Sequence, residues 1–133
     1  MDEPLYDAVQ LPIVAFAIVA ALSLPGRVRL RIPDAGLRVG LILMDCFPQF
    51  ESVGRRLQWS FRVRSTAADA ISFLESTGMV QVHDRDGARA LELLTNGRTF
   101  VHRTRGEKSD AATLLEALRT SAMRTRHEEL RLL

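Results

Sequence analysis

The histidines and the cysteine are the side chains best suited to hold a metal ion or to act as a nucleophile. His83, His102, His127 and Cys46 are scattered along the sequence, without the close spacing that a zinc site requires. Cys46 lies in an apolar segment and is expected in the core. The sequence also lacks a phosphate-binding glycine loop, a nucleophile elbow and a dinucleotide-binding motif. We therefore predict a protein that is not an enzyme and that uses no metal or cofactor.

Arginine is the remaining residue type with obvious binding chemistry. All but Lys108 of the 18 basic residues are arginines, and the guanidinium group matches phosphate and carboxylate groups with paired hydrogen bonds. A GC-rich coding sequence would produce the same bias, however, and the net charge is only +2. That balance falls short of the strong positive field of a histone-like protein. The overall charge therefore does not by itself indicate nucleic-acid binding.

The composition describes a folded globular domain. The 133 residues are 47% hydrophobic and 26% charged, which is typical of a chain with a packed core. We predict a single domain over residues 1–133. A lone cysteine cannot form an internal disulfide, so a reducing compartment, the cytoplasm, is the simpler expectation.

Residues 9–24, VQLPIVAFAIVAALSL, form the most apolar stretch of the sequence. The run is shorter than the about 20 apolar residues that cross a bilayer, and the acidic residues before it do not fit a secretory signal. Pro12 suits the first turn of a helix, and Pro25-Gly26 suits the residues just after its end. We therefore predict a core helix over residues 11–23 and no association with a membrane.

A helix that is apolar on every face must be covered on every face. In so small a domain, we expect a second copy of the chain or a partner protein to supply part of that cover. The N-terminal and C-terminal helices would form this interface. Its expected residues are Phe16, Ile18, Leu22, Leu114 and Leu118.

Hydrophobic periodicity, turn residues and helix caps place the remaining elements. GRVRLRI alternates arginine with apolar residues, which predicts a half-buried strand. Asp86-Gly87 is typical of a two-residue hairpin turn, Gly78 of a helix C-cap, and Ser109 or Asp110 of a helix N-cap. The predicted elements are a strand over 27–32, helices over 33–47, 51–59 and 66–77, strands over 79–83 and 88–94, a helix from about 95, and a helix over 109–130.

The helix ending in FLESTGMV, the hairpin after it and the stretch LTNGRTFV resemble the winged helix-turn-helix fold of MarR-type and PadR-type regulators. The resemblance covers about residues 50–105. It implies a mainly α fold with a small antiparallel β-wing, extended at both ends by extra helices around a core of about 27–105. It also implies a dimeric DNA-binding protein. The matching positions are Leu74, Gly78, Met79, Val80, Leu94, Thr95, Gly97, Phe100 and Val101.

Two regions depart from this family pattern. QWSFRVR, between the predicted second and third helices, is longer than the tight turn of a helix-turn-helix. Residues 1–48 are instead loosely similar to the small winged-helix subunits that accompany SMC-like or ABC-type ATPases in bacterial defence systems. That similarity implies an alternative function, a non-enzymatic adaptor that docks on another protein.

The helix over 66–77 is the candidate recognition helix, yet it carries two acidic residues, Asp69 and Glu75, and no basic one. Phosphate contacts would come from arginines before this helix and on the wing, with small residues near the groove. The wing arginines have acidic neighbours, Asp84 and Asp86. We expect a DNA-binding transcriptional regulator, with the adaptor as the alternative. The candidate DNA-binding residues are Arg55, Arg56, Arg62, Arg64, Ser65, Ala68, Ser72, Arg85 and Arg89.

Overall fold

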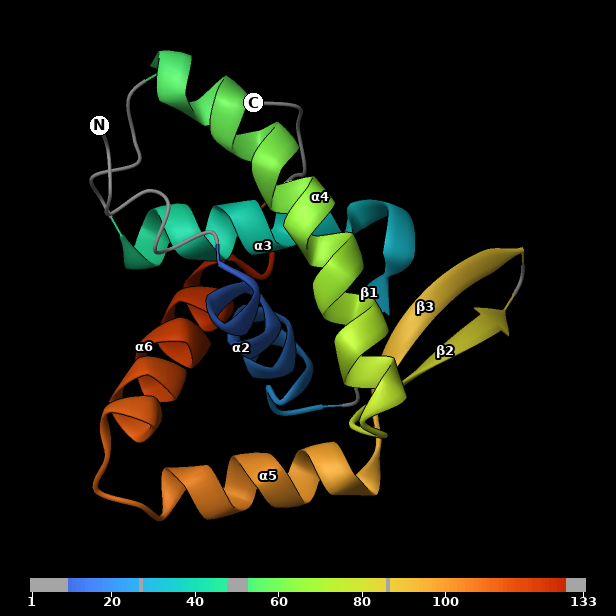
Figure 1. Cartoon of the computed structure of the whole chain (residues 1–133), viewed down its shortest axis with the longest axis vertical. Coiled ribbons are helices and arrows are strands. Elements are labelled where there is room, and N and C mark those ends of the chain that lie inside the picture. Colours follow the sequence, from blue (N-terminus) through green and yellow to red (C-terminus); the bar gives the residue numbers. More distant parts are fainter. Residues whose placement is uncertain (1–9, 27, 48–52, 86, 129–133) are drawn as a thin grey trace.

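The computed structural model describes residues 10–26, 28–47, 53–85 and 87–128 (Figure 1). This part of the chain is mainly helical and contains one small antiparallel sheet, as the sequence predicted. Its elements are α2 (Leu11–Leu22), β1 (Leu30–Arg31), α3 (Ile32–Cys46), α4 (Val53–Ser76), β2 (Val80–Arg85), β3 (Ala88–Leu93), α5 (Thr95–Arg105) and α6 (Asp110–Thr125).

Helix α2 is the centre of the domain and corresponds to the predicted apolar helix. In Figure 1 it lies among α3, α4, α5 and α6, and it packs against all four. Pro12 occupies its first turn and Ser23 follows its last residue. Ile18 is completely buried, and Phe16 packs edge-to-face on Phe100 of α5 with ring centroids 5.7 Å apart. The described part of the chain contains no helix long and apolar enough to cross a membrane.

The residues expected at an oligomer interface serve instead as core within one chain. Ile18, Leu22 and Leu118 are buried, and Phe16 and Leu114 are partly buried against the same core. Four helices of the same chain supply the cover that we expected from a partner, because α6 and α4 close the faces of α2 that α3 and α5 leave open. The expected dimer therefore loses its main support.

Strand β1 is shorter than the predicted strand over 27–32. Only Leu30 and Arg31 are paired, opposite Leu91 and Ala90 of β3, and helix α3 begins at the next residue. Pro33 explains the early helix start, because its fixed φ and its missing N–H suit the first turn of a helix. Residue 27 lies outside the described residues.

Helix α4 replaces two predicted helices, and the prediction of a break between residues 59 and 66 was wrong. Val63, Ala67, Ala70 and Leu74 are all buried, and their spacing of four, three and four forms one uninterrupted apolar stripe. The segment contains no proline, and no glycine interrupts it between residues 55 and 77. A continuous stripe packed on α2 and α3 therefore outweighs the weak capping-box signal of Thr66 and Asp69, on which the predicted helix start at residue 66 rested.

Gly78 ends α4 as predicted. Its φ of +75° lies in the left-handed region, and its N–H donates to the carbonyl of Glu75 at 3.1 Å. The N–H of Met79 donates to the carbonyl of Leu74 at 3.0 Å, which completes a Schellman motif. The chain is thereby turned directly from the end of α4 into β2.

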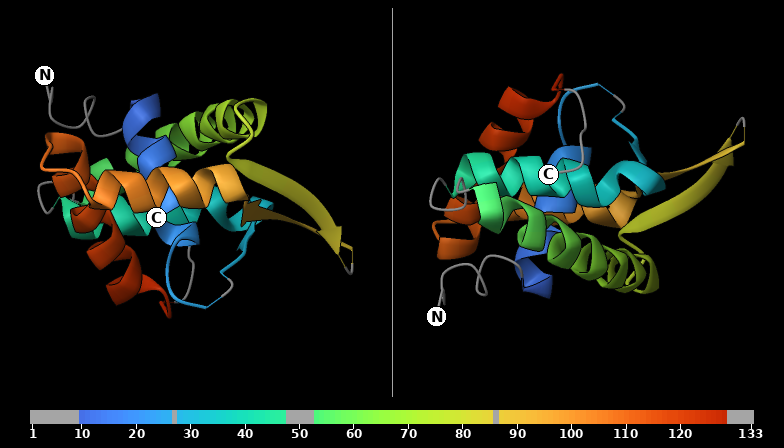
Figure 2. Two further views of the ribbon diagram at one scale, coloured as in Figure 1. Left: turned by 90° about the horizontal axis from the view of Figure 1, so that it is seen from below. Right: turned by 90° about the horizontal axis from the view of Figure 1, so that it is seen from above.

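The hairpin of β2 and β3 has the predicted two-residue turn. Arg85 is paired with Ala88, so two residues separate the paired strands, and Gly87 has a φ of +76°. Asp86 lies outside the described residues. The sheet order is β1-β3-β2, and Figure 2 shows the hairpin projecting from the helical body.

Helix α6 packs against α2, α3 and α5. Ser109 caps it, because its hydroxyl accepts the N–H of Ala112 at 3.2 Å. The helix ends at Thr125, earlier than the predicted 130, and residues 129–133 lie outside the described residues.

Candidate nucleic-acid interface

The outer face of α4 holds most of the predicted DNA-binding residues. The buried stripe from Val63 to Leu74 turns the opposite face of the helix to solvent. On that face, the candidates whose side chains are described and exposed are Arg62, Arg64, Ser65, Ala68 and Ser72. The uninterrupted helix therefore joins residues that the sequence had assigned to a loop and to a separate helix.

Arginine and acidic residues are separated along α4. Residues 53–68, here called the basic half, contain four arginines and no acidic residue. Residues 69–76, here called the acidic half, contain Asp69 and Glu75 and no basic residue. Arg55 and Arg56 lie in the first turns of the basic half, and their side chains are outside the described part of the structure. The helix thus has a positive start and a negative end.

The basic half is fixed to the body where α4 crosses α3. A Cβ atom placed on Gly36 of α3 would lie 2.9 Å from the Cα of Arg64, so glycine is required for this close approach. The aliphatic part of Arg64 lies over Gly36, while the residue as a whole is exposed. The crossing therefore positions the start of the Arg64 side chain and leaves its charged end accessible to solvent.

The wing contributes less positive charge than its arginines suggest. Arg89 lies opposite Asp84 in the hairpin register, and its Nε is 3.5 Å from the Asp84 carboxylate. Both side chains are well exposed, so the pair is weak, but it reduces the charge that Arg89 offers to a phosphate. The side chain of Arg85 is outside the described part of the structure, as is Asp86.

The other face of the hairpin carries a polar cluster that the sequence analysis missed. The Nε2 of His83 lies 2.6 Å from the Oε2 of Glu92, and the amide of Gln81 lies 3.4 Å from the Nδ1 of His83. The predicted hairpin could have revealed this cluster. Residues 81 and 83 share one face of the hairpin, and residue 92 is opposite residue 81. This cluster contains the carboxylate of Glu92 and adds no phosphate-binding surface.

The structure also shows the surroundings of the histidine, cysteine and carboxylate side chains. No three histidine, cysteine, aspartate or glutamate side chains within residues 10–26, 28–47, 53–85 and 87–128 come together as a metal site. Burial raises the pKa of the Cys46 thiol above its ordinary value, which reduces the thiolate fraction needed for nucleophilic attack.

The chain was also compared with known proteins. No family model, curated protein or solved structure matches it.

Proposed function

We propose that this protein is a winged-helix DNA-binding protein that acts as a transcriptional regulator, with the basic half of α4 as its main contact. The order of elements supports the winged-helix assignment. A helix and a short strand precede two helices, a hairpin follows, and the first strand pairs with the second strand of the hairpin. In such an arrangement α4 occupies the position of the recognition helix.

The observation that carries the proposal is the segregation of charge on α4. Recognition helices place their N-terminal residues against the DNA, and here the N-terminal half holds four arginines without an acidic residue. The acidic residues, Asp69 and Glu75, lie in the half that packs toward the hairpin. The helix can therefore present a positive surface to phosphates even though its total charge is small.

The proposed contact is dominated by phosphates. Ser65, Ala68 and Ser72 are small, so the helix surface between the arginines can approach the edge of a groove closely. These side chains offer at most two hydroxyl groups for reading bases, whereas specific readers use arginine, asparagine or glutamine there. We therefore expect strong dependence on salt and only modest discrimination between sequences.

Fluorescence anisotropy with a short labelled DNA duplex tests the proposal. The key variant is Arg62→Ala/Arg64→Ala. Each lost phosphate contact weakens binding about eightfold at about 0.1 M salt, so the pair should cost about 60-fold. The control, Arg103→Ala/Lys108→Ala, removes the same charge from exposed positions on α5 and in the loop after it. If the control loses as much affinity as the key variant, or if neither loses any, the proposed surface is wrong.

A second candidate function, a non-enzymatic adaptor that docks on another protein, is favoured by one observation. Phe73 is 48% exposed on the acidic half of α4, where a large apolar side chain suits a protein partner better than DNA. The same anisotropy experiment separates the two functions. Failure to bind DNA even at about 50 mM salt, where phosphate contacts are strong, would count against the regulator and favour the adaptor. Light scattering of the purified protein would show whether it dimerises.

A further inference from the structure

A pocket of 360 Å³ lies at the root of the hairpin. It is formed by the turn after α2, the residues before β1, the end of β3 and one face of α5. Its apolar walls are Leu22, Leu24, Val28, Leu93 and Val101. The volume is at the lower end of the range of about 300–1,000 Å³ for small-molecule sites.

Positive charge gathers at this pocket. Arg29, Arg98 and Arg105 line it together with His102, against a single carboxylate, Glu92. Two of these charges are already engaged, because Arg105 binds Glu116 at 2.6 Å and Glu92 binds His83 at 2.6 Å. The side chains of Arg29 and Arg98 make no ion pair or hydrogen bond to any other residue in the described part of the chain. Two guanidinium groups are therefore available beside an apolar wall.

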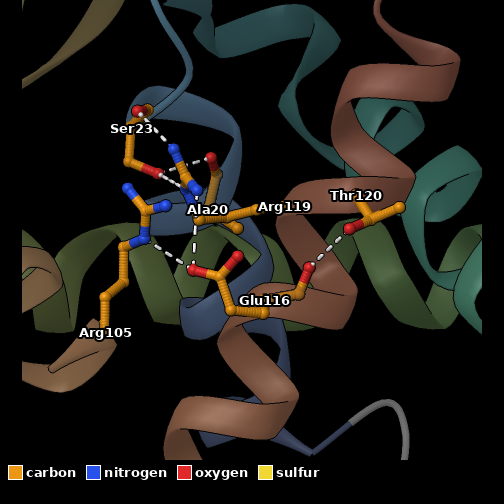
Figure 3. A network of polar contacts seen from close by, with 6 residues as sticks. All are labelled: Ala20, Ser23, Arg105, Glu116, Arg119 and Thr120. Atoms are coloured by element: carbon orange, nitrogen blue, oxygen red, sulfur yellow. Dashed lines mark hydrogen bonds and ion pairs between the residues drawn. The ribbon is translucent and has the colours of Figure 1, made fainter. Parts of the chain in front are cut away.

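A polar network holds one wall of the pocket in place (Figure 3). The Nε of Arg119 donates to the hydroxyl of Ser23 at 2.9 Å, and its Nη2 donates to the Ser23 carbonyl at 3.3 Å. Glu116 accepts a hydrogen bond from Arg105 at 2.6 Å and forms an ion pair with Arg119 at 3.6 Å, which links α5 and α6 to the turn after α2. Arg119 is only 13% exposed, whereas the Arg105 and Glu116 side chains are 48% and 47% exposed, so only the Arg119 end of this network is shielded from water. The pocket is thus preformed rather than assembled by a ligand.

We propose that this pocket binds a small organic anion, a carboxylate carried on an apolar group. Arg29 and Arg98 would hold the carboxylate through charge-assisted hydrogen bonds, and Leu24, Val28 and Val101 would cover the apolar body. The carboxylate of Glu92 in the same wall disfavours a dianion such as phosphate. This proposal does not rest on DNA binding, because none of its residues belongs to α4.

Titration calorimetry with 2-naphthoate tests the proposal, with 2-naphthylmethanol and inorganic phosphate as comparison ligands. We expect 2-naphthoate to bind the purified chain, and both other ligands to bind at least tenfold more weakly, since one lacks the charge and the other lacks the apolar body. Arg98→Gln should weaken 2-naphthoate binding at least tenfold. Arg103→Gln, the matched control on the same helix, should leave it unchanged because Arg103 does not line the pocket.

Amide shifts in a nitrogen-15 NMR spectrum give an independent readout that needs no variant. The binding of 2-naphthoate should shift the amides of Leu24, Val28 and Val101, and Arg29→Lys should reduce affinity while preserving the fold. The proposal is overturned if 2-naphthoate does not bind, if phosphate binds as tightly, if the shifts occur elsewhere, or if Arg103→Gln weakens binding as much as Arg98→Gln.

Discussion

The two halves of α4 share one buried stripe but present different outer surfaces. Val63 and Ala67 in the basic half and Ala70 and Leu74 in the acidic half are all buried, so both halves are anchored by the same kind of apolar contact. Their exposed sides differ, because the arginines precede residue 69 and the carboxylates follow it. The inner face of this helix therefore specifies the fold, while the outer face can vary in charge without cost to the core.

The anchoring of the two halves also differs in kind. The acidic half is fixed by its C-cap, where Gly78 turns the chain into β2. The basic half is fixed by its crossing with α3, where Gly36 allows Arg64 to approach. In Figure 1 the first turns of α4 extend past this crossing and away from the hairpin. A charged helix end that projects from a rigid body is suited to contact an extended partner.

The largest expected effect comes from removing the charge of the basic half altogether. Replacing Arg55, Arg56, Arg62 and Arg64 together by glutamine should weaken DNA binding by about 10³-fold to 10⁴-fold at about 0.1 M salt, because four phosphate contacts are lost. Fluorescence anisotropy measures the affinity, and circular dichroism checks the helix. Replacing the same four residues by lysine keeps the charge and should change affinity by only a few fold. Equal losses in both variants would show that charge does not carry the binding.

The crossing that holds the basic half should be sensitive to a single methyl group. Gly36→Ala should lower the free energy of unfolding by about 1–3 kcal/mol, because the new Cβ would collide with Arg64 and push α4 away from α3. Gly40→Ala on the same helix is the matched control, since its Cβ would meet no atom within 4 Å. It should raise the free energy of unfolding by about 0.5–1 kcal/mol. Urea denaturation measures both, and equal changes would contradict the proposed close contact.

The cap that holds the acidic half should respond to backbone strain alone. Gly78→Ala should cost about 1–2 kcal/mol of unfolding free energy, because a residue with a Cβ is strained at a φ of +75°. The space itself is adequate, since the nearest atom to the new Cβ would be the Nδ2 of Asn96 at 3.5 Å. Gly78→Asn should cost less, because asparagine tolerates this conformation better. If asparagine proves as costly as alanine in thermal denaturation, crowding rather than strain sets the preference.

The smallest expected effect comes from the charges of the acidic half. Asp69→Asn/Glu75→Gln should strengthen DNA binding by about twofold to threefold at low salt, because two carboxylates that repel the phosphate backbone become neutral. The gain should disappear as salt rises toward physiological ionic strength. A gain as large as the loss from Arg62→Ala/Arg64→Ala would mean that the acidic half, rather than the basic half, lies closest to the DNA.

Local signals in the sequence predicted the parts of this fold that depend on neighbouring residues. Gly78, the turn at residues 86 and 87, and the Ser109 cap each reflect the conformational or hydrogen-bonding preference of one or two residues. The continuity of α4 was missed because a local capping signal at residue 66 was given more weight than the buried stripe. Only tertiary packing shows that Val63 and Leu74 face the same core.

The candidate sites show the same division between local and long-range information. The exposure of Ser72 was predictable from helical periodicity, whereas the place of Arg62 and Arg64 on the same helix was not. The pocket beside Arg98 depends on residues that are distant in the chain. The hydrogen bond between Ser23 and Arg119, which shapes one wall, joins positions 96 residues apart, and nothing in either local sequence indicates it.

The salt dependence of DNA binding tests the central claim most directly. If the four arginines of the basic half each contact a phosphate, a plot of log affinity against log salt should have a slope of about −3.6 for the natural protein. For Arg62→Ala/Arg64→Ala, the slope should fall to about −1.8. A slope near zero for the natural protein, or the same slope for both proteins, would contradict a phosphate contact made by the basic half of α4.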